Sequence, residues 1–397
     1  MDAISKIFLE YDVRREEIEV SLSEMKQQIS PYMDQILIYG AGSSGIAFVH
    51  QLNKIDVTPL YFIDSDEEKV NTSCEGIPVI APGDILKKVS GEFLVIVCIN
   101  TDGKRYCKSF AEALRVGGHH AVYEKLKASG CKNIIDYTYF RRCHALFTDE
   151  RYNAPSCSDV YLMGHHRKAI SQVYGWMADE LSREIFEKIV RFRMLDDSID
   201  VPTNPQERQY FEESLYEKKN DEIFVDCGAF NGISLKAFLH ECGDAFEGYY
   251  GLEPDPDNYC RLEQYIYTLP PGVQEKINIF PEAVWKDNGG VDLYAMHGPG
   301  SFVADIGNTN VISTTIDGML AGKRASYIKM NIEGSEKEAL QGAEDTIKTY
   351  KPGLAVAGYH RTDDLWKIPH MVKSYREDYK IYLRSYMNHI SFIFYMV

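Results

Sequence analysis

The chain has 397 residues, of which 45% are hydrophobic and 26% charged, and it carries a net charge of −16. Its length predicts two or three globular domains. The acidic balance argues against nucleic acid as a partner, because phosphate binding relies on clustered Lys and Arg. No apolar stretch reaches the ~18 residues of a membrane span, so no membrane partner is expected. A charged N-terminus and nine cysteines without a CxxC pair indicate a reduced, cytoplasmic protein.

Residues 1–34 are predicted to form one or two N-terminal helices. Apolar residues recur at helical spacing among many charges, as Ile4, Ile7, Phe8 and Tyr11 illustrate. Such amphipathic helices pack on the domain that follows or on another copy of the chain, which leaves a homo-oligomer open.

Residues 35–145 are predicted to form a Rossmann-like domain. The sequence QILIYGAGSSGIAFVHQL places Gly40, Gly42 and Gly45 at GxGxxG spacing, directly after an apolar strand and before a helix. The next strand ends at Asp64, where an acid binds the ribose of a dinucleotide. That strand spans 59–63. Strands at 93–99 and 133–136 and a helix at 104–116 continue the alternation.

Two interpretations of this first glycine turn stay open. The stretches YGAGSSG (39–45), FIDSDEEK (62–69) and EGIPVIAPGDI (75–85) resemble the nucleotide-binding-like domain at the front of bacterial polysaccharide-biosynthesis proteins. The resemblance implies an N-terminal site for a nucleotide or nucleotide sugar, formed by Gly40, Gly42, Ser44, Gly45 and Asp64. Alternatively the glycines only let helix and strand pack closely. An NAD-dependent oxidoreductase acting through this domain is a further alternative.

Residues 146–220 are predicted to be a helical connector. The segment GWMADELSREIFEKIVRFRM (175–194) has apolar residues at helical intervals, and Pro202 and Pro205 follow it. His165 and His166 lie in this connector without further ligands at metal spacing, so we interpret them as surface or packing residues.

A second strand, glycine turn and helix opens the last segment, residues 221–397. The sequence EIFVDCGAFNGISLKAF (222–238) lacks GxGxxG, and the strand 249–252 ends at Glu253, which is placed to bind a ribose. The loop after a strand at 277–280 is expected to flank an adenine ring. A ribose acid without a phosphate cradle favours S-adenosylmethionine over NAD. The predicted cofactor-binding residues are Asp226, Gly228, Ala229, Phe230, Asn231, Gly232, Glu253, Pro254, Glu282, Ala283 and Val284.

Residues 175–397 resemble the FkbM family of S-adenosylmethionine-dependent methyltransferases. The matching stretches are FVDCGAFNGIS (224–234), GLEPDPDN (251–258), STTIDGML (313–320), YIKMNIEGSEKEALQGAEDTIKTYKP (327–352) and YHRTDDLWKIP (359–369). The alternation of strands and helices predicts an α/β fold with two Rossmann-like doubly wound domains, and the alternating segments 380–384 and 391–396 predict a terminal hairpin. The resemblance implies that the C-terminal domain is a seven-strand class I methyltransferase sheet. It also implies methyl transfer to a hydroxyl of a small molecule, a sugar or polyol-like metabolite.

One position departs from the family pattern. The family usually reads Lys-x-Asp-x-Glu-Gly where this chain has Asn331 in place of the acid. The alternative is therefore a non-catalytic binding protein with a decayed methyltransferase site.

The candidate catalytic residues are Lys329, Glu333 and His360, on loops expected at the cofactor's edge of the sheet. Lys329 would orient substrate or stabilise negative charge, and Glu333 or His360 would take the hydroxyl proton. For Lys329 the alternative is a strand residue with its amine at the solvent, and for His360 a packing role. No metal is assigned, although His360 and Asp364 are an alternative ligand pair. Two local features are interpreted as structural: a Ser335–Glu338 capping box, and Asp317 as a cap for 318–320.

Overall fold

The computed structural model describes residues 1–99, 120–137, 139–140, 160–195, 200–295, 300–303, 307–387 and 391–397. The chain divides into two compact units, the first comprising 1–167 and 187–200, the second 168–186 and 201–397. The predicted helix 104–116 and the start of the predicted connector lie outside the described residues. Among the described helices, none has the length and apolar character needed to cross a membrane.

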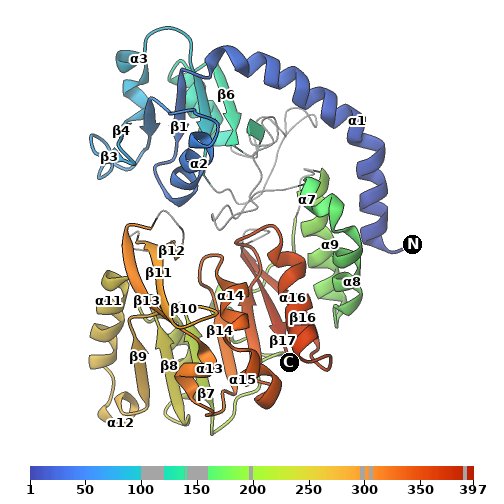
Figure 1. Ribbon diagram of the computed structural model, residues 1–397, viewed down its shortest axis with the longest axis vertical. Helices are drawn as coiled ribbons and strands as arrows, with labels where there is room; N and C mark the ends of the chain where they lie inside the picture. The colour runs from blue at the N-terminus through green and yellow to red at the C-terminus, as the bar shows by residue number, and fades with distance from the viewer. Residues whose placement is uncertain are drawn as a thin grey trace. The chain divides into compact units, whose positions relative to one another are not determined.

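The first unit contains a six-stranded sheet in the order β3-β4-β2-β1-β5-β6 (Figure 1). All its pairs are parallel except β3 with β4. Its strands are β1 (Ile36–Tyr39), β2 (Tyr61–Ile63), β3 (Ser73–Cys74), β4 (Ile77–Ile80), β5 (Leu94–Val97) and β6 (Asn133–Asp136). Strands β1 and β5 are buried along their whole length, as expected of parallel strands covered on both faces. The Rossmann-like prediction for this unit is confirmed.

A single long helix precedes that sheet. Helix α1 (Ala3–Ile29) begins at Asp2, whose side chain accepts a hydrogen bond from the backbone N–H of Ser5. Its Asp12 pairs with Arg167 at 2.6 Å. The other helical segments of the first unit are η1 (Ser30–Tyr32), α2 (Ser43–Asn53), η2 (Pro82–Asp84), α3 (Ile85–Lys88), α5 (His120–Ala128) and α7 (Val160–His165). Helices α8 (Arg167–Trp176) and α9 (Glu180–Leu195) cross the boundary between the two units along the chain.

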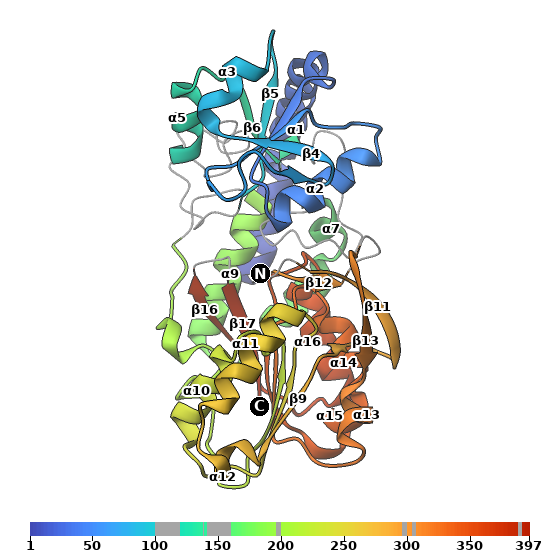
Figure 2. The same ribbon diagram turned by 90° about the vertical axis from the view of Figure 1, so that its left-hand side faces the viewer.

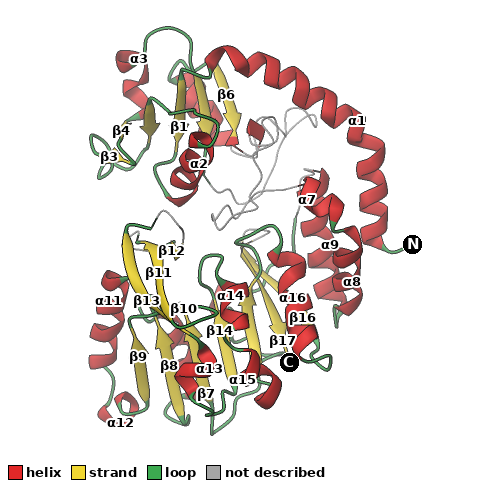
Figure 3. Ribbon diagram, in the orientation of Figure 1, coloured by secondary structure: helices red, strands yellow, loops and turns green. Residues whose placement is uncertain are grey.

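The second unit contains a seven-stranded sheet in the order β16-β17-β15-β14-β7-β8-β9 (Figure 3). Only β17 runs antiparallel to its neighbours. The strands are β7 (Ile223–Cys227), β8 (Gly248–Leu252), β9 (Ile277–Phe280), β14 (Tyr327–Met330), β15 (Gly353–Ala357), β16 (Ile381–Met387) and β17 (Ser391–Met396). The predicted terminal hairpin and seven-strand sheet are therefore confirmed.

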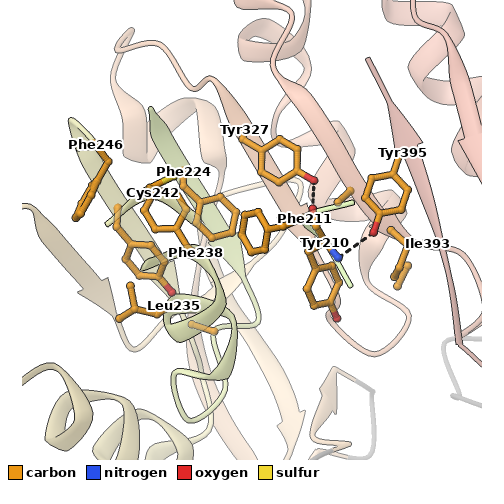
Figure 4. Packing of buried hydrophobic residues seen from close by; sticks show 14 of the residues in the cluster. Tyr210, Phe211, Phe224, Leu235, Phe238, Cys242, Phe246, Tyr327, Ile393 and Tyr395 are labelled. Carbon is orange, nitrogen blue, oxygen red and sulfur yellow. Dashed lines mark hydrogen bonds between the residues drawn. The ribbon is translucent and has the colours of Figure 1, made fainter. Parts of the chain in front are cut away.

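Helices cover both faces of this sheet, with α10 on one face and α14 and α15 on the other (Figure 2). The helical segments are η3 (Gln206–Arg208), α10 (Ile233–Cys242), α11 (Pro256–Tyr267), α12 (Pro271–Gln274), α13 (Ile316–Leu320), α14 (Glu336–Gln341), α15 (Glu344–Tyr350) and α16 (Asp364–Tyr375). Phe211, Phe224 and Phe238 lie at the centre of a buried aromatic cluster between sheet and helices (Figure 4). The two faces are thus sealed, and the strand ends remain for ligands.

Along the chain, a smaller sheet is inserted between β9 and β14 of the seven-stranded sheet. Its order is β10-β13-β11-β12, with β10 (Ala283–Val284), β11 (Gly289–Tyr294), β12 (Phe302–Val303) and β13 (Thr309–Thr314). It follows β9 directly, so it begins at the same edge of the sheet as the predicted cofactor loops. The sequence analysis did not predict this insertion.

Candidate functional site

The turn between β7 and α10 is shaped by two glycines with positive φ. Gly228 has φ +83° and Gly232 has φ +89°, a region that side chains disfavour. A Cβ atom on Gly228 would lie 2.3 Å from the backbone oxygen of Asn331. The turn therefore passes too close to the end of β14 for any other residue.

The side chain of Lys329 binds this turn through hydrogen bonds. Strand register places it beside Asp226, and its Nζ donates to Asp226 Oδ1 at 2.9 Å, to the carbonyl of Cys227 at 3.3 Å and to that of Gly228 at 2.7 Å. Burial opposes the ammonium charge, but Asp226, Tyr210 and Cys227 together outweigh burial and raise the pKa of Lys329. The alternative of an amine at the solvent is wrong, because the side chain is only 3% exposed.

Asp226 is fully buried and is not among the residues that line the cavity described below. Its Oδ2 accepts hydrogen bonds from Tyr249 at 2.7 Å and from Ser234, and its Oδ1 accepts from Lys329. The carboxylate thus supports the turn through protein donors, and the direct cofactor contact expected from the sequence stays a prediction.

Glu253, at the end of β8, faces the space above the turn. Its Oε2 accepts from the backbone N–H of Phe230 at 2.9 Å and its Oε1 from that of Asp255 at 3.1 Å. A carboxylate has about four lone-pair sites, so acceptor capacity remains for a ligand. Burial raises the pKa of Glu253 to about 7, although these backbone hydrogen bonds favour the ionised form.

A cavity of about 180 Å³, open to the solvent, lies at the carboxyl ends of the strands. The predicted residues that line it are Gly228, Phe230, Glu253, Pro254, Glu282, Ala283, Val284, Lys329 and Glu333. The predicted residues that do not are Asp226, Ala229, Asn231, Gly232 and His360. Both glycines and Ala229 still shape the turn, whereas Asn231 points to the solvent.

Several lining residues were not predicted. The inserted sheet contributes Leu293, Ser301 and Val303, and Ser301 Oγ bonds Asp255 Oδ2 at 2.7 Å. The same Asp255 caps α11 through the N–H groups of Asp257 and Asn258. The remaining unpredicted lining residues are Tyr210, Ile233, Ser234, Leu252, Asn258, Gly300, Asn331, Ile332 and Ser335. The EPDPDN motif could have indicated Asn258, and the departure from the family motif at Asn331 could have indicated that residue.

The loop between β14 and α14 presents Glu333 to the cavity. Glu333 has φ +55°, a strained conformation that often occurs at functional sites. His360 lies beneath it, with its Nε2 3.6 Å from Glu333 Oε1 and its Nδ1 2.8 Å from Glu336 Oε1. Glu336 also accepts from the N–H of Ile332 at 2.9 Å. His360 therefore links the carboxylates of Glu333 and Glu336, and this carboxylate–imidazole–carboxylate arrangement stabilises the loop.

Both ring nitrogens of His360 face carboxylates, and His360 does not line the cavity. Burial disfavours the imidazolium, but Glu336 and Glu333 outweigh burial and raise the pKa of His360 well above its usual range. The proton-accepting role considered for His360 stays a prediction. Asp364, the second residue of the alternative metal-ligand pair, accepts a hydrogen bond from Lys337 Nζ at 2.7 Å.

Two predicted caps differ from the structure. Ser335 makes no capping hydrogen bond to α14. Helix α13 is capped by Thr315, and Asp317 accepts from the N–H groups of Asp345 and Thr346 at the start of α15.

In the first unit, the turn after β1 carries the predicted glycines. A Cβ atom on Gly45 would lie 2.0 Å from the backbone oxygen of Gly40, whereas one on Gly42 would meet nothing within 4 Å. Ser44 is buried. Asp64 Oδ2 accepts from the N–H of Ala41 at 2.9 Å. Close packing accounts for Gly40 and Gly45, and a ligand at this turn stays a prediction.

The strand order of the second unit, with one antiparallel strand and a cavity above the β7 turn, defines a class I methyltransferase fold. Residues 226–393 match the family model of the methyltransferase FkbM domain. Over these residues the second unit is therefore similar to the methyltransferase domain of the FkbM family.

One solved structure supports the fold. The methyltransferase FkbM from Methylobacillus flagellatus KT superposes with a TM-score of 0.69 and 19% identity over 100% of both chains. A putative rRNA methylase from Clostridium thermocellum (TM-score 0.32, 9% identity, 47% of this chain and 94% of that one) and the putative methyltransferase SMU.1697c from Streptococcus mutans in complex with SAH (0.28, 10%, 46% and 91%) are too distant to carry an argument. No functionally curated protein sequence matches the chain significantly.

Proposed function

We propose that the second unit binds S-adenosylmethionine and methylates a hydroxyl of a small sugar or polyol-like molecule. The observation that carries this proposal is the cavity above the β7 turn, where Glu253 and Glu333 lie on different strand ends. Glu253 would accept hydrogen bonds from both ribose hydroxyls. The adenine would lie against 282–284, and the methionine end above Gly228, with no phosphate-binding group required.

Methyl transfer then needs alignment and a base. The acceptor oxygen attacks the methyl carbon in line, the carbon–sulfur bond breaks, and its electron pair stays on the sulfur, which becomes a neutral thioether. Glu333 would take the hydroxyl proton, because it lines the cavity and is partly exposed, with 27% of its side chain accessible. Alignment contributes about 7 kcal/mol or more, and a base roughly a hundredfold in rate.

Calorimetry with S-adenosylhomocysteine tests the cofactor assignment. We expect binding by the wild-type protein, at least tenfold weaker binding by Glu253→Gln, and unchanged binding by Glu275→Gln, an exposed acid before β9. Absence of heat with S-adenosylmethionine and S-adenosylhomocysteine would overturn the proposal. Parallel titrations with NAD and UDP-glucose test the alternatives, since binding of either one alone would favour an oxidoreductase or a nucleotide-sugar binding protein.

A further inference from the structure

Tyr210 is held against the cavity in a conformation that a tyrosine rarely adopts. Its φ is +76°. Its backbone N–H donates to the hydroxyl of Tyr395 at 2.8 Å, and its carbonyl accepts from the hydroxyl of Tyr327 (Figure 4). Two buried tyrosines on β17 and β14 thus fix both sides of one peptide. Strain that the surroundings enforce so completely is typical of a functional position.

Within the described part of the chain, the hydrogen bonds to the Tyr210 hydroxyl are all of one kind. It accepts from Asn331 Nδ2 at 2.9 Å and from Gln209 Nε2 at 3.3 Å. The amide oxygen of Asn331 accepts in turn from Tyr359 at 3.2 Å, which orients the Asn331 side chain. Burial raises the pKa of Tyr210, so its hydroxyl stays protonated. Since both contacts use the oxygen's lone pairs, the proton of Tyr210 is left to be donated.

Asn331 determines this polarity. An amide presents a donor to one tyrosine and an acceptor to the other, whereas a carboxylate at the same position would accept from both. With aspartate there, Tyr210 would donate its proton to residue 331 and present only lone pairs to the cavity. Asparagine at 331 therefore makes Tyr210 a donor.

We propose that Tyr210 and Glu333 form an acceptor subsite that selects an alcohol. This subsite rests on the function proposed above. Both residues line the cavity. An alcohol oxygen accepts a hydrogen bond from Tyr210, whose proton stays on the phenol, with one lone pair. It attacks the methyl group with the other lone pair and passes its own hydrogen to Glu333. The methyl leaves the sulfonium, whose electron pair stays on sulfur, and Glu333 ends protonated at an accessible edge. A protonated amine has no lone pair for Tyr210, and a carboxylate has no proton for Glu333.

The test uses S-adenosylmethionine labelled in its methyl group with ethylene glycol and ethylenediamine as matched probes. We expect wild-type transfer to the glycol and little to the diamine. Tyr210→Phe and Asn331→Asp should each lower glycol transfer at least tenfold, while S-adenosylhomocysteine affinity changes less than twofold. The control Tyr379→Phe, which removes a buried hydroxyl bonded to the carbonyl of Pro352, should leave transfer unchanged.

The double variant separates donation from a purely structural role. If Asn331→Asp acts by redirecting the Tyr210 proton, adding Tyr210→Phe causes little further loss, so the effects are far from additive. Additive losses, equal transfer to glycol and diamine, or no transfer to glycol while S-adenosylhomocysteine still binds would each overturn the subsite. Failure of S-adenosylhomocysteine to bind would instead overturn the function on which the subsite rests.

Discussion

The two glycine turns of this protein share one local design and differ in what surrounds it. In each, an acid after the second strand accepts an N–H from the turn: Asp64 from Ala41 at 2.9 Å, and Glu253 from Phe230 at 2.9 Å. Each acid also accepts the N–H two residues further on. Gly228 and Phe230 of the second turn line the same cavity as Glu253, whereas the pocket lined by Asp64 contains none of the glycines Gly40, Gly42 and Gly45. The two turns therefore differ in what encloses the acid.

The two acids also differ in how deeply they are buried and in the charged groups beside them. Glu253 is buried beside Asp255 and Asn258, and burial raises its pKa to about 7. Asp64 is only half-buried, with Lys69 3.7 Å away. Beneath the second turn, Lys329 adds a fully buried cation that binds two turn carbonyls. The second turn is thus built around buried charge.

The largest expected effect comes from removing that cation. Lys329→Met leaves Asp226 buried without its partner, so the free energy of unfolding should fall by about 3–5 kcal/mol. In the first unit, Lys69→Met removes a cation that is 42% exposed and should cost no more than about 1 kcal/mol. Urea denaturation followed by circular dichroism measures both. Equal losses would contradict the contrast between the turns.

The next largest effect concerns the carboxylate–imidazole–carboxylate arrangement that stabilises the β14–α14 loop. His360→Leu should lower the free energy of unfolding by about 3 kcal/mol, because it strands the buried Glu336. Adding Glu336→Met should recover part of that loss. Since the folded pKa of His360 is raised, its stabilisation is complete below about pH 6.5 and is lost as pH rises through the folded pKa. The double variant should lack this alkaline loss, and its persistence there would exclude His360 as the cause.

The raised pKa of Glu253 predicts pH-dependent binding. Ribose hydroxyls donate to the ionised carboxylate, so binding releases the proton that burial holds on Glu253. Affinity for S-adenosylhomocysteine should therefore increase as pH rises through about 7 and level off above it. Calorimetry at a series of pH values measures this. Glu253→Gln should bind weakly with a flat profile, and a wild-type affinity independent of pH would contradict the assignment.

The smallest expected effect separates packing from ligand binding in the first unit. Gly42→Ala meets no atom within 4 Å and should change the free energy of unfolding by less than about 1 kcal/mol. Gly45→Ala should cost more, because its Cβ would lie 2.0 Å from Gly40. Thermal shift with UDP-glucose then tests occupancy. A shift in the wild-type protein that disappears in Gly42→Ala would sharpen the comparison by assigning a ligand to this turn as well.

Local features of this protein were predictable from sequence, and contacts between distant segments were not. Apolar runs that end in an acid and a glycine predicted β7, β8 and Glu253, because hydrophobic periodicity and turn-forming residues can be recognised within a short stretch of sequence. The role of Lys329 depends on the register that pairs β14 with β7, across a separation of 103 residues. Tyr210 depends on hydroxyls from β14 and β17, so nothing near it in the chain marks it.

A crystal structure of the protein with S-adenosylhomocysteine tests the central claim most directly. The account predicts both ribose hydroxyls on Glu253, adenine against 282–284, and the sulfur facing the space between Tyr210 and Glu333. A ligand bound at Asp64 instead, or a sulfur turned away from Tyr210 and Glu333, would contradict it.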